Sequence, residues 1–250
     1  MLRFALTFCS IIILSSFSFA QVMPTAGVSD EFKRIAIAGN SKLQHGEMFQ
    51  GFSSTYTQGS QFFNLEWASG YITTTGNQII RDSSFQYKFD KLRHELFISV
   101  KTNDGTEPTQ VLLADKSQIS SFLILSDMDH VFVPGRTFGT DRPLDFYEVL
   151  AKNDSGYTLL KHIASQFVKY DVNDFTRRMR GDVYDEYVDK ISYYISIRSS
   201  RAQPVSFKVK SFLALIPAEK KPIAEDYFMN NRDKEENDIF MIRLVKALNQ

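Results

Sequence analysis

The sequence predicts an α+β protein, with an antiparallel β-rich body followed by a helical C-terminal segment. Short runs rich in β-branched and aromatic residues recur between residues 62 and 210, and turn sequences such as Asn153-Asp154-Ser155-Gly156 separate them. Many short strands with turns at this spacing are typical of a sandwich, a barrel or a half-barrel. In residues 211–250 the apolar residues recur at helical spacing instead, which predicts helices there.

Residues 1–20 have the layout of a cleaved secretory signal peptide. Arg3 precedes an apolar run, and small residues up to Ala20 suit cleavage before Gln21. The run is shorter than the roughly 20 apolar residues of a membrane anchor. Cys9 precedes this run, whereas a lipoprotein cysteine would follow it. We therefore expect export to the periplasm or the cell exterior, and no transmembrane span in the mature chain.

Composition excludes several classes of function. Cleavage would remove Cys9, the only cysteine, so disulfides, a cysteine nucleophile and zinc–thiolate sites are not expected. It would also remove Arg3, which leaves 28 basic residues (29 minus 1) against 29 acidic ones. Such a balance argues against nucleic acid as a partner, because phosphate binding needs a clustered basic surface, and the densest basic run, residues 177–180, is diluted by neighbouring acidic residues.

The first strand pair is expected around Gly76-Asn77, after an N-terminal segment of undecided structure over residues 21–61. Glycine adopts the positive φ that opens a two-residue type II′ loop, so this dipeptide predicts a hairpin. In that register Thr75 faces Gln78 and Thr73 faces Ile80. The hairpin begins the β-rich domain, which is expected to span residues 62–210.

The predicted register sorts the hairpin side chains into two faces. Trp67 and Tyr71 share the half-exposed face, which makes them the candidate ligand-binding residues, although cross-strand packing is the competing interpretation. Glu66 points to the opposite side. The core face is expected to carry Ala68, Gly70, Ile72, Ile79, Tyr87 and Phe89.

Further strands are expected from apolar and β-branched runs bounded by turn residues. The charged stretch 173–186 is expected to be an excursion between two of them. The predicted strands are residues 94–101, 110–114, 119–125, 131–133, 146–152, 157–170, 191–198 and 204–209.

The helical segment is expected to contain two short pieces, at residues 211–216 and 222–230, and one longer helix ending near Leu248. Asp233 and Glu236 fit a capping box at the start of that longer helix. Its apolar face is formed by residues four apart, namely Phe240, Leu244 and Leu248.

No catalytic or metal-binding motif stands out, and neither a metal nor a cofactor is expected. Asp127, Asp129 and His130 would suit a divalent ion, but aspartate is common in turns between strands, and the turn is the favoured interpretation. Glu66 is interpreted as a carboxylate at the rim of the sheet, with a role as a general acid as the alternative. His45, His94, His130 and His162 show no HxxxH or HxH spacing, and His162 is interpreted as structural.

Four segments carry a pattern shared with other proteins, namely "LEWASGYITTTGNQIIRDSSFQYKFDKLRHELFISV", "LDFYEVLAKNDSGYTLLKH", "SYYISIR" and the closing "KEENDIFMIRLVKALNQ". Together they resemble uncharacterised exported proteins of Bacteroidota. The resemblance covers most of residues 62–250 and its motifs are structural. It therefore implies export and an envelope location, and no assigned activity.

The function expected from the sequence is that of a non-enzymatic envelope or secreted protein that binds a ligand or partner. The ligand would be a small molecule, a lipid, a glycan or another envelope protein. Two alternatives remain open: a hydrolase that uses carboxylates such as Glu66, Asp127 or Asp129, and a structural component of an envelope assembly.

Overall fold

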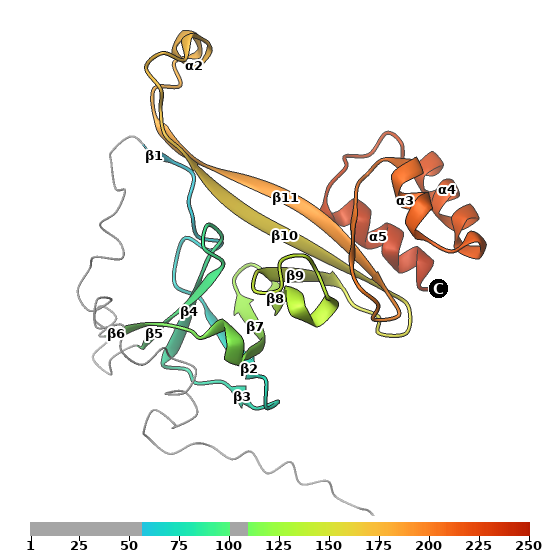
Figure 1. Ribbon diagram of the computed structural model, residues 1–250, viewed down its shortest axis with the longest axis horizontal. Coiled ribbons are helices and arrows are strands. Elements are labelled where there is room, and N and C mark those ends of the chain that lie inside the picture. The colour runs from blue at the N-terminus through green and yellow to red at the C-terminus, as the bar shows by residue number, and fades with distance from the viewer. Residues whose placement is uncertain (1–56, 101–109) are drawn as a thin grey trace, which may run out of the picture.

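The computed structural model describes residues 57–100 and 110–250. The expected signal peptide and most of the 21–61 segment lie outside these residues. The described chain forms a large sheet, a small sheet and a C-terminal group of helices (Figure 1). The α+β class and the antiparallel β-rich body are therefore confirmed.

The large sheet has nine strands in the order β1-β11-β10-β9-β8-β7-β2-β3, with β12 beside β11. Its pairings are antiparallel except that between β1 and β11. The strands are β1 (Thr57–Gln58), β2 (Ser69–Thr74), β3 (Ile79–Ile80), β7 (Ile119–Leu125), β8 (Asp129–Pro134), β9 (Phe146–Ala151), β10 (Tyr157–Val168), β11 (Asp185–Ile197) and β12 (Gln203–Val205).

The small sheet is an antiparallel meander of β4 (Phe85–Asp90), β5 (Glu95–Val100) and β6 (Gln110–Leu113). Residues from both sheets form one apolar core, in which Tyr87 and Phe89 of β4 are buried with Phe122 of β7 and Phe132 of β8. The two sheets therefore share one core.

The first hairpin differs from the predicted register by one residue. Ile72 pairs with Ile80 and Thr73 pairs with Ile79. The loop has three residues, because Thr74 N donates to Gln78 O at 2.9 Å and Asn77 N donates to Thr74 O at 3.0 Å. Asn77, and not Gly76, has the positive φ of 60°. Asparagine tolerates the left-handed region, so the same dipeptide supports this longer loop.

The shift changes the second strand of the hairpin and leaves the first unchanged. Gly70 and Ile72 are buried as expected. Ile79, expected in the core, is 65% exposed, and Ile80 is buried in its place. The predicted second strand also breaks after β3, so Tyr87 reaches the core from the small sheet.

The strands β10 and β11 form the longest ladder, from Tyr157 opposite Ile197 to Val168 opposite Glu186. In Figure 1 this pair extends well beyond the small sheet and carries α2 (Phe175–Arg180) at its tip. The Asp174 side chain caps α2 by accepting a hydrogen bond from Arg177 N at 3.0 Å. The predicted charged excursion is therefore a capped helical tip.

The C-terminal helices are α3 (Val209–Leu215), α4 (Lys221–Asn230) and α5 (Asp238–Leu248). The apolar face of α5 is buried, as predicted, and lies against β9 and β10. The predicted capping box is wrong, because the N-cap of α5 is Asn237, whose side chain accepts from Phe240 N at 3.1 Å. Residues 211–250 therefore pack on one end of the large sheet.

None of the helices in residues 57–100 and 110–250 combines the length and the apolar character that crossing a bilayer demands.

Candidate functional site

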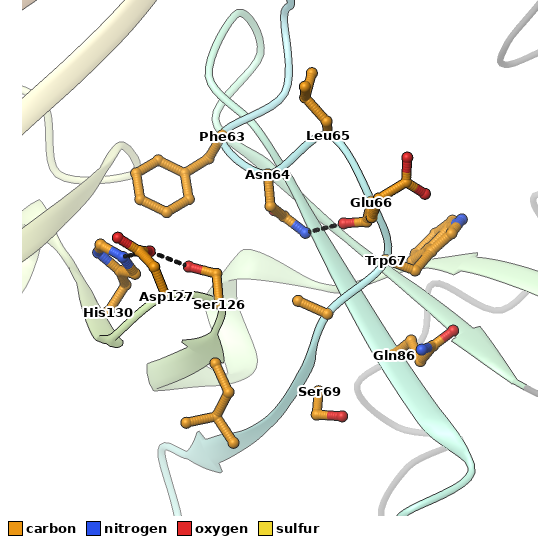
Figure 2. A pocket seen from close by; sticks show the side chains of 12 residues that line it. Phe63, Asn64, Leu65, Glu66, Trp67, Ser69, Gln86, Ser126, Asp127 and His130 are labelled. Carbon is orange, nitrogen blue, oxygen red and sulfur yellow. Dashed lines mark hydrogen bonds and ion pairs between the residues drawn. The ribbon is translucent and has the colours of Figure 1, made fainter.

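An open hollow of about 600 Å³ lies where the segment before β2 passes over β4 and the turn between β7 and β8 (Figure 2). Seven of its twelve lining side chains are polar or charged, and five are apolar. The lining residues are Phe63, Asn64, Leu65, Glu66, Trp67, Ala68, Ser69, Gln86, Leu125, Ser126, Asp127 and His130.

Glu66 and Trp67 both line this hollow, so the predicted separation of these two side chains across a sheet is wrong. The alternation of a strand does not apply to them, because β2 begins only at Ser69 and residues 63–66 form a bend. Ala68 forms an isolated bridge to Tyr87 of β4, which brings the bend onto the small sheet.

Asn64 holds the bend in place. Its side chain is buried, and Nδ2 donates to Glu66 O at 2.5 Å and to Tyr87 O at 3.1 Å. Its Oδ1 accepts a longer hydrogen bond of 3.4 Å from Phe89 N. One amide group therefore ties the backbone next to Trp67 to strand β4.

His130 lies between two carboxylates at one wall of the hollow. Its Nδ1 is 2.6 Å from Oε1 of buried Glu148, and its Nε2 is 3.2 Å from Oδ1 of Asp127. Hydrogen bonds from Ser126 and His130 lower the pKa of Asp127 to about 2, so this exposed carboxyl is ionised at neutral pH. Both ring nitrogens can donate to these carboxylates only when the imidazole is protonated.

The opposite wall carries Trp67. The ammonium of Lys88 lies 5.7 Å from its ring centroid and 4.8 Å from that of Phe62, within the range of a cation–π contact. Burial lowers the pKa of Lys88, and the nearby Glu66 partly opposes this shift. In Figure 2 Trp67 and Gln86 lie together, on the far side of Asn64 from His130.

The hollow therefore contains some predicted site residues and not others. Trp67, Glu66, Asp127 and His130 line it, whereas Tyr71 and Asp129 are not among its lining residues. Tyr71 lies further along β2, paired with Leu123 of β7. The predicted ligand-binding pair is thus reduced to Trp67 at this site.

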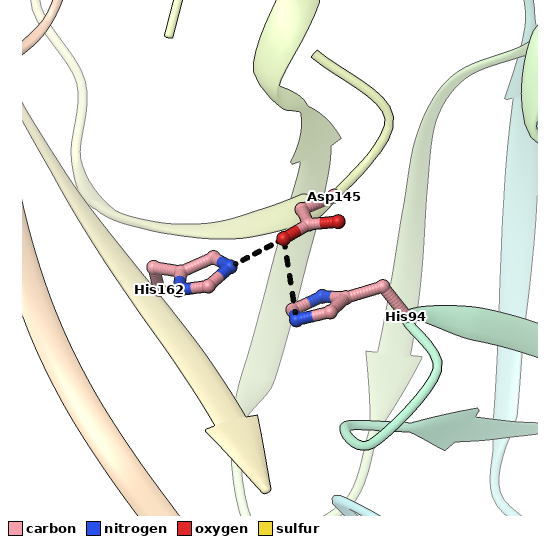
Figure 3. A group of neighbouring side chains, drawn as sticks. All are labelled: His94, Asp145 and His162. Carbon is pink, nitrogen blue, oxygen red and sulfur yellow. Dashed lines mark hydrogen bonds and ion pairs between the residues drawn. The ribbon is translucent and has the colours of Figure 1, made fainter. Parts of the chain in front are cut away.

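A second group of side chains, His94, Asp145 and His162, offers ligand atoms that all lie within 4.8 Å of one another (Figure 3). His162 Nε2 lies 3.0 Å from Asp145 Oδ2, and His94 Nε2 lies 3.6 Å from the same oxygen. Sequence spacing gave no sign of this group, because its members meet only through the pairing of β9 with β10 and the packing of the β4–β5 turn against these strands.

No family model, no curated protein and no solved structure matches this chain.

Proposed function

We propose that this protein is an exported, non-enzymatic binding protein that holds a carbohydrate in the hollow between Trp67 and His130. The observation that supports it is the lining, in which one indole and one phenyl ring lie among carboxylate, amide and hydroxyl groups. An aromatic face packs against the apolar face of a sugar ring, and the polar groups pair with its hydroxyls.

Among the ligands expected from the sequence, a glycan suits this lining better than a lipid. A lipid tail needs an enclosed apolar cavity, because its binding derives from apolar surface removed from water. This hollow is open, and Glu66, Asp127 and His130 are among its lining residues, so it does not enclose a lipid tail.

A carboxylate-dependent hydrolase is the second candidate, because Glu148, His130 and Asp127 form a chain of hydrogen bonds that reaches the hollow. Binding is favoured over this alternative on chemical grounds. His130 Nε2 faces a carboxylate and not the hydroxyl of a nucleophile. Asp127, ionised at neutral pH, has no proton to give to a leaving group.

The test uses the fluorescence of Trp67, which is the only tryptophan of the chain and so reports on the hollow alone. The protein is titrated with oligosaccharides of glucose and of N-acetylglucosamine, and separately with palmitate. We expect a saturable change in fluorescence with one sugar series, with a dissociation constant between about 1 μM and 1 mM, and no change with palmitate.

Two variants locate the site by calorimetry. Trp67→Ala is expected to weaken binding by at least about tenfold, equivalent to about 1.4 kcal/mol. Tyr71→Phe, outside the hollow, serves as the matched control and is expected to bind as the unmodified protein does. Saturable binding of palmitate, or sugar binding that survives Trp67→Ala, would contradict the proposal. Release of shorter sugars during the titration would favour the hydrolase.

A further inference from the structure

We propose that His94, Asp145 and His162 form a binding site for a divalent transition-metal ion of the zinc class, which links the small sheet to the large one. His94 lies in the turn between β4 and β5, Asp145 directly precedes β9, and His162 lies on β10. This site is separate from the hollow and does not depend on the proposed carbohydrate ligand.

The donor set and its spacing suit such an ion. Two imidazoles and one carboxylate are ligands that zinc accepts, at about 2.0–2.2 Å from the metal, so two donors of a tetrahedral site lie about 3.3 Å apart. The distances from Asp145 Oδ2 to His162 Nε2 and to His94 Nε2 are 3.0 and 3.6 Å. Both are close to that tetrahedral spacing.

The side chain of His94 is the independent sign that a ligand belongs here. It is buried, with 4% of the residue exposed, and neither ring nitrogen makes a hydrogen bond within the described structure. Buried polar groups that lack a hydrogen bond are costly and uncommon. His94 also has a left-handed backbone, with a φ of 52°, a conformation that histidine adopts more often than most residues. A metal bond would satisfy Nε2, one of the two ring nitrogens that lack a hydrogen bond.

The two rings must tilt before both can bind one ion. They are stacked, with centroids 4.6 Å apart and planes 10° apart, whereas a metal lies near the plane of each imidazole that binds it. Rotation of the His94 ring about χ2 would change the direction of its Nε2 lone pair, and this torsion has a broad energy minimum. His94 has no hydrogen bond that the rotation would break.

Lys116 and Arg142 are the cations near His94 that would oppose a bound dication. Arg142 Nη1 lies 3.6 Å from Asp145 Oδ2, but its side chain is 59% exposed, so solvent screens its charge.

A bound ion would add a cross-link between the β4–β5 turn and the large sheet, which polar contacts already join. Ser165 N of β10 donates to Lys91 O of the β4–β5 turn at 3.1 Å, and the Lys91 ammonium pairs with Asp189 of β11 at 2.6 Å. The metal would fix the same turn to β10 and to the residue before β9. Three protein ligands also leave one coordination position for water or another small ligand.

The test uses the purified full-length protein, prepared without a polyhistidine tag and stripped of metal with a chelator. Zinc chloride is titrated by calorimetry, and thermal unfolding is followed with and without zinc. We expect one ion per chain and a higher melting temperature with excess zinc, because an ion that binds only the folded state stabilises it. Cobalt(II) is expected to give the visible absorption of a four- or five-coordinate site.

Two substitutions and one matched control identify the ligands. His94→Asn keeps a residue that tolerates the left-handed backbone, and His162→Gln keeps a polar side chain on β10. Each is expected to weaken zinc binding by more than the roughly 10- to 100-fold lost when a group hydrogen-bonded to a metal ligand is removed. His130→Gln, which removes an imidazole from the other histidine–carboxylate group, is expected to bind zinc as before.

Ring-nitrogen NMR of the unmodified protein covers the case in which a substitution prevents folding. Zinc is expected to shift the ring signals of two of the four histidines. Absence of stoichiometric binding, or no shift in any histidine, would overturn the proposal. So would zinc binding that persists in both folded variants or that disappears in His130→Gln.

Discussion

The side chain of Asn249 pairs with the backbone of Tyr157 as a neighbouring strand would. Asn249 Oδ1 accepts from Tyr157 N at 2.7 Å, and Asn249 Nδ2 donates to Tyr157 O at 3.0 Å. Asn249 directly follows α5, and Tyr157 is the first residue of β10. The end of the last helix is therefore joined to the sheet by a two-bond contact that spans 92 residues of sequence.

Asn249→Ala should lower the free energy of unfolding by about 1–3 kcal/mol, because it leaves the Tyr157 amide and carbonyl without these partners. Urea denaturation followed by circular dichroism measures the loss. Asn230→Ala, at the exposed end of α4, is the control and should change stability by less than about 0.5 kcal/mol. Equal effects of the two substitutions would mean that the Asn249 contact does not stabilise the fold.

Gly70 is the one glycine of β2, and its lack of a side chain allows β2 to pack closely against its neighbours. A Cβ at this position would overlap the carbonyl oxygen of Leu123 on β7 and would lie 3.1 Å from Cδ2 of Tyr87. Gly70→Ala should therefore lower the free energy of unfolding by about 1–3 kcal/mol or more, as overpacking of a core does. In the hairpin loop a Cβ on Gly76 would be 3.6 Å from Thr74 Oγ1, which is ordinary contact.

Gly76→Ala is accordingly the control for Gly70→Ala, and chemical denaturation of both variants compares them. Gly76 does not have a positive φ, so alanine fits its backbone and should leave stability nearly unchanged or raise it by a few tenths of a kcal/mol. The interpretation fails if the loop variant is the less stable of the two.

Tyr87 should make the protein sensitive to alkaline pH. Burial, and then the charge of Asp82, raises the pKa of Tyr87 well above its usual range. The folded state therefore retains the phenolic proton after the unfolded state has lost it at a pKa of about 10. The resulting contribution to stability is complete below pH 10 and declines as the pH rises further toward the folded-state pKa.

Tyr87→Phe should make this decline shallower by about 1.4 kcal/mol per pH unit above pH 10, which corresponds to one proton fewer released on unfolding. Near pH 7 the substitution should be neutral or stabilising, because the buried hydroxyl has no hydrogen-bond partner among the described residues. Urea denaturation at pH 7 and between pH 9 and 11 measures both effects. Parallel pH profiles for the two proteins would refute the assignment to Tyr87.

The parts of the fold that could be predicted are those governed by local pattern. Gly70 and Ile72 are two residues apart on one face of a strand, and this spacing predicted the buried face of β2. The four-residue repeat of Phe240, Leu244 and Leu248 predicted the buried face of α5. The loop at Gly76-Asn77 shows the limit of this reasoning. One dipeptide is compatible with two loop lengths. A difference of one residue in loop length moves the side chains of the second strand to the opposite face of the sheet.

The candidate sites were less predictable because they depend on contacts between distant segments. His130 meets Glu148 only because β8 pairs with β9 in the register that sets Phe132 opposite Glu148. His94 and His162 come from different sheets. Trp67 and Glu66 were assigned to opposite faces by extending strand alternation into a bend, where the rule of alternating side chains has no physical basis.

Asn64 should determine the position of that bend and of Trp67 beside the hollow. Asn64→Ala removes the hydrogen bonds to Glu66 O and Tyr87 O. We expect it to lower the free energy of unfolding by about 1–3 kcal/mol and to increase the access of acrylamide to Trp67, measured as a larger quenching constant in the folded protein. Ser69→Ala, on an exposed residue that also lines the hollow, should leave the quenching unchanged. If Asn64→Ala reduces stability without altering the quenching of Trp67, Asn64 stabilises the small sheet and does not position the indole.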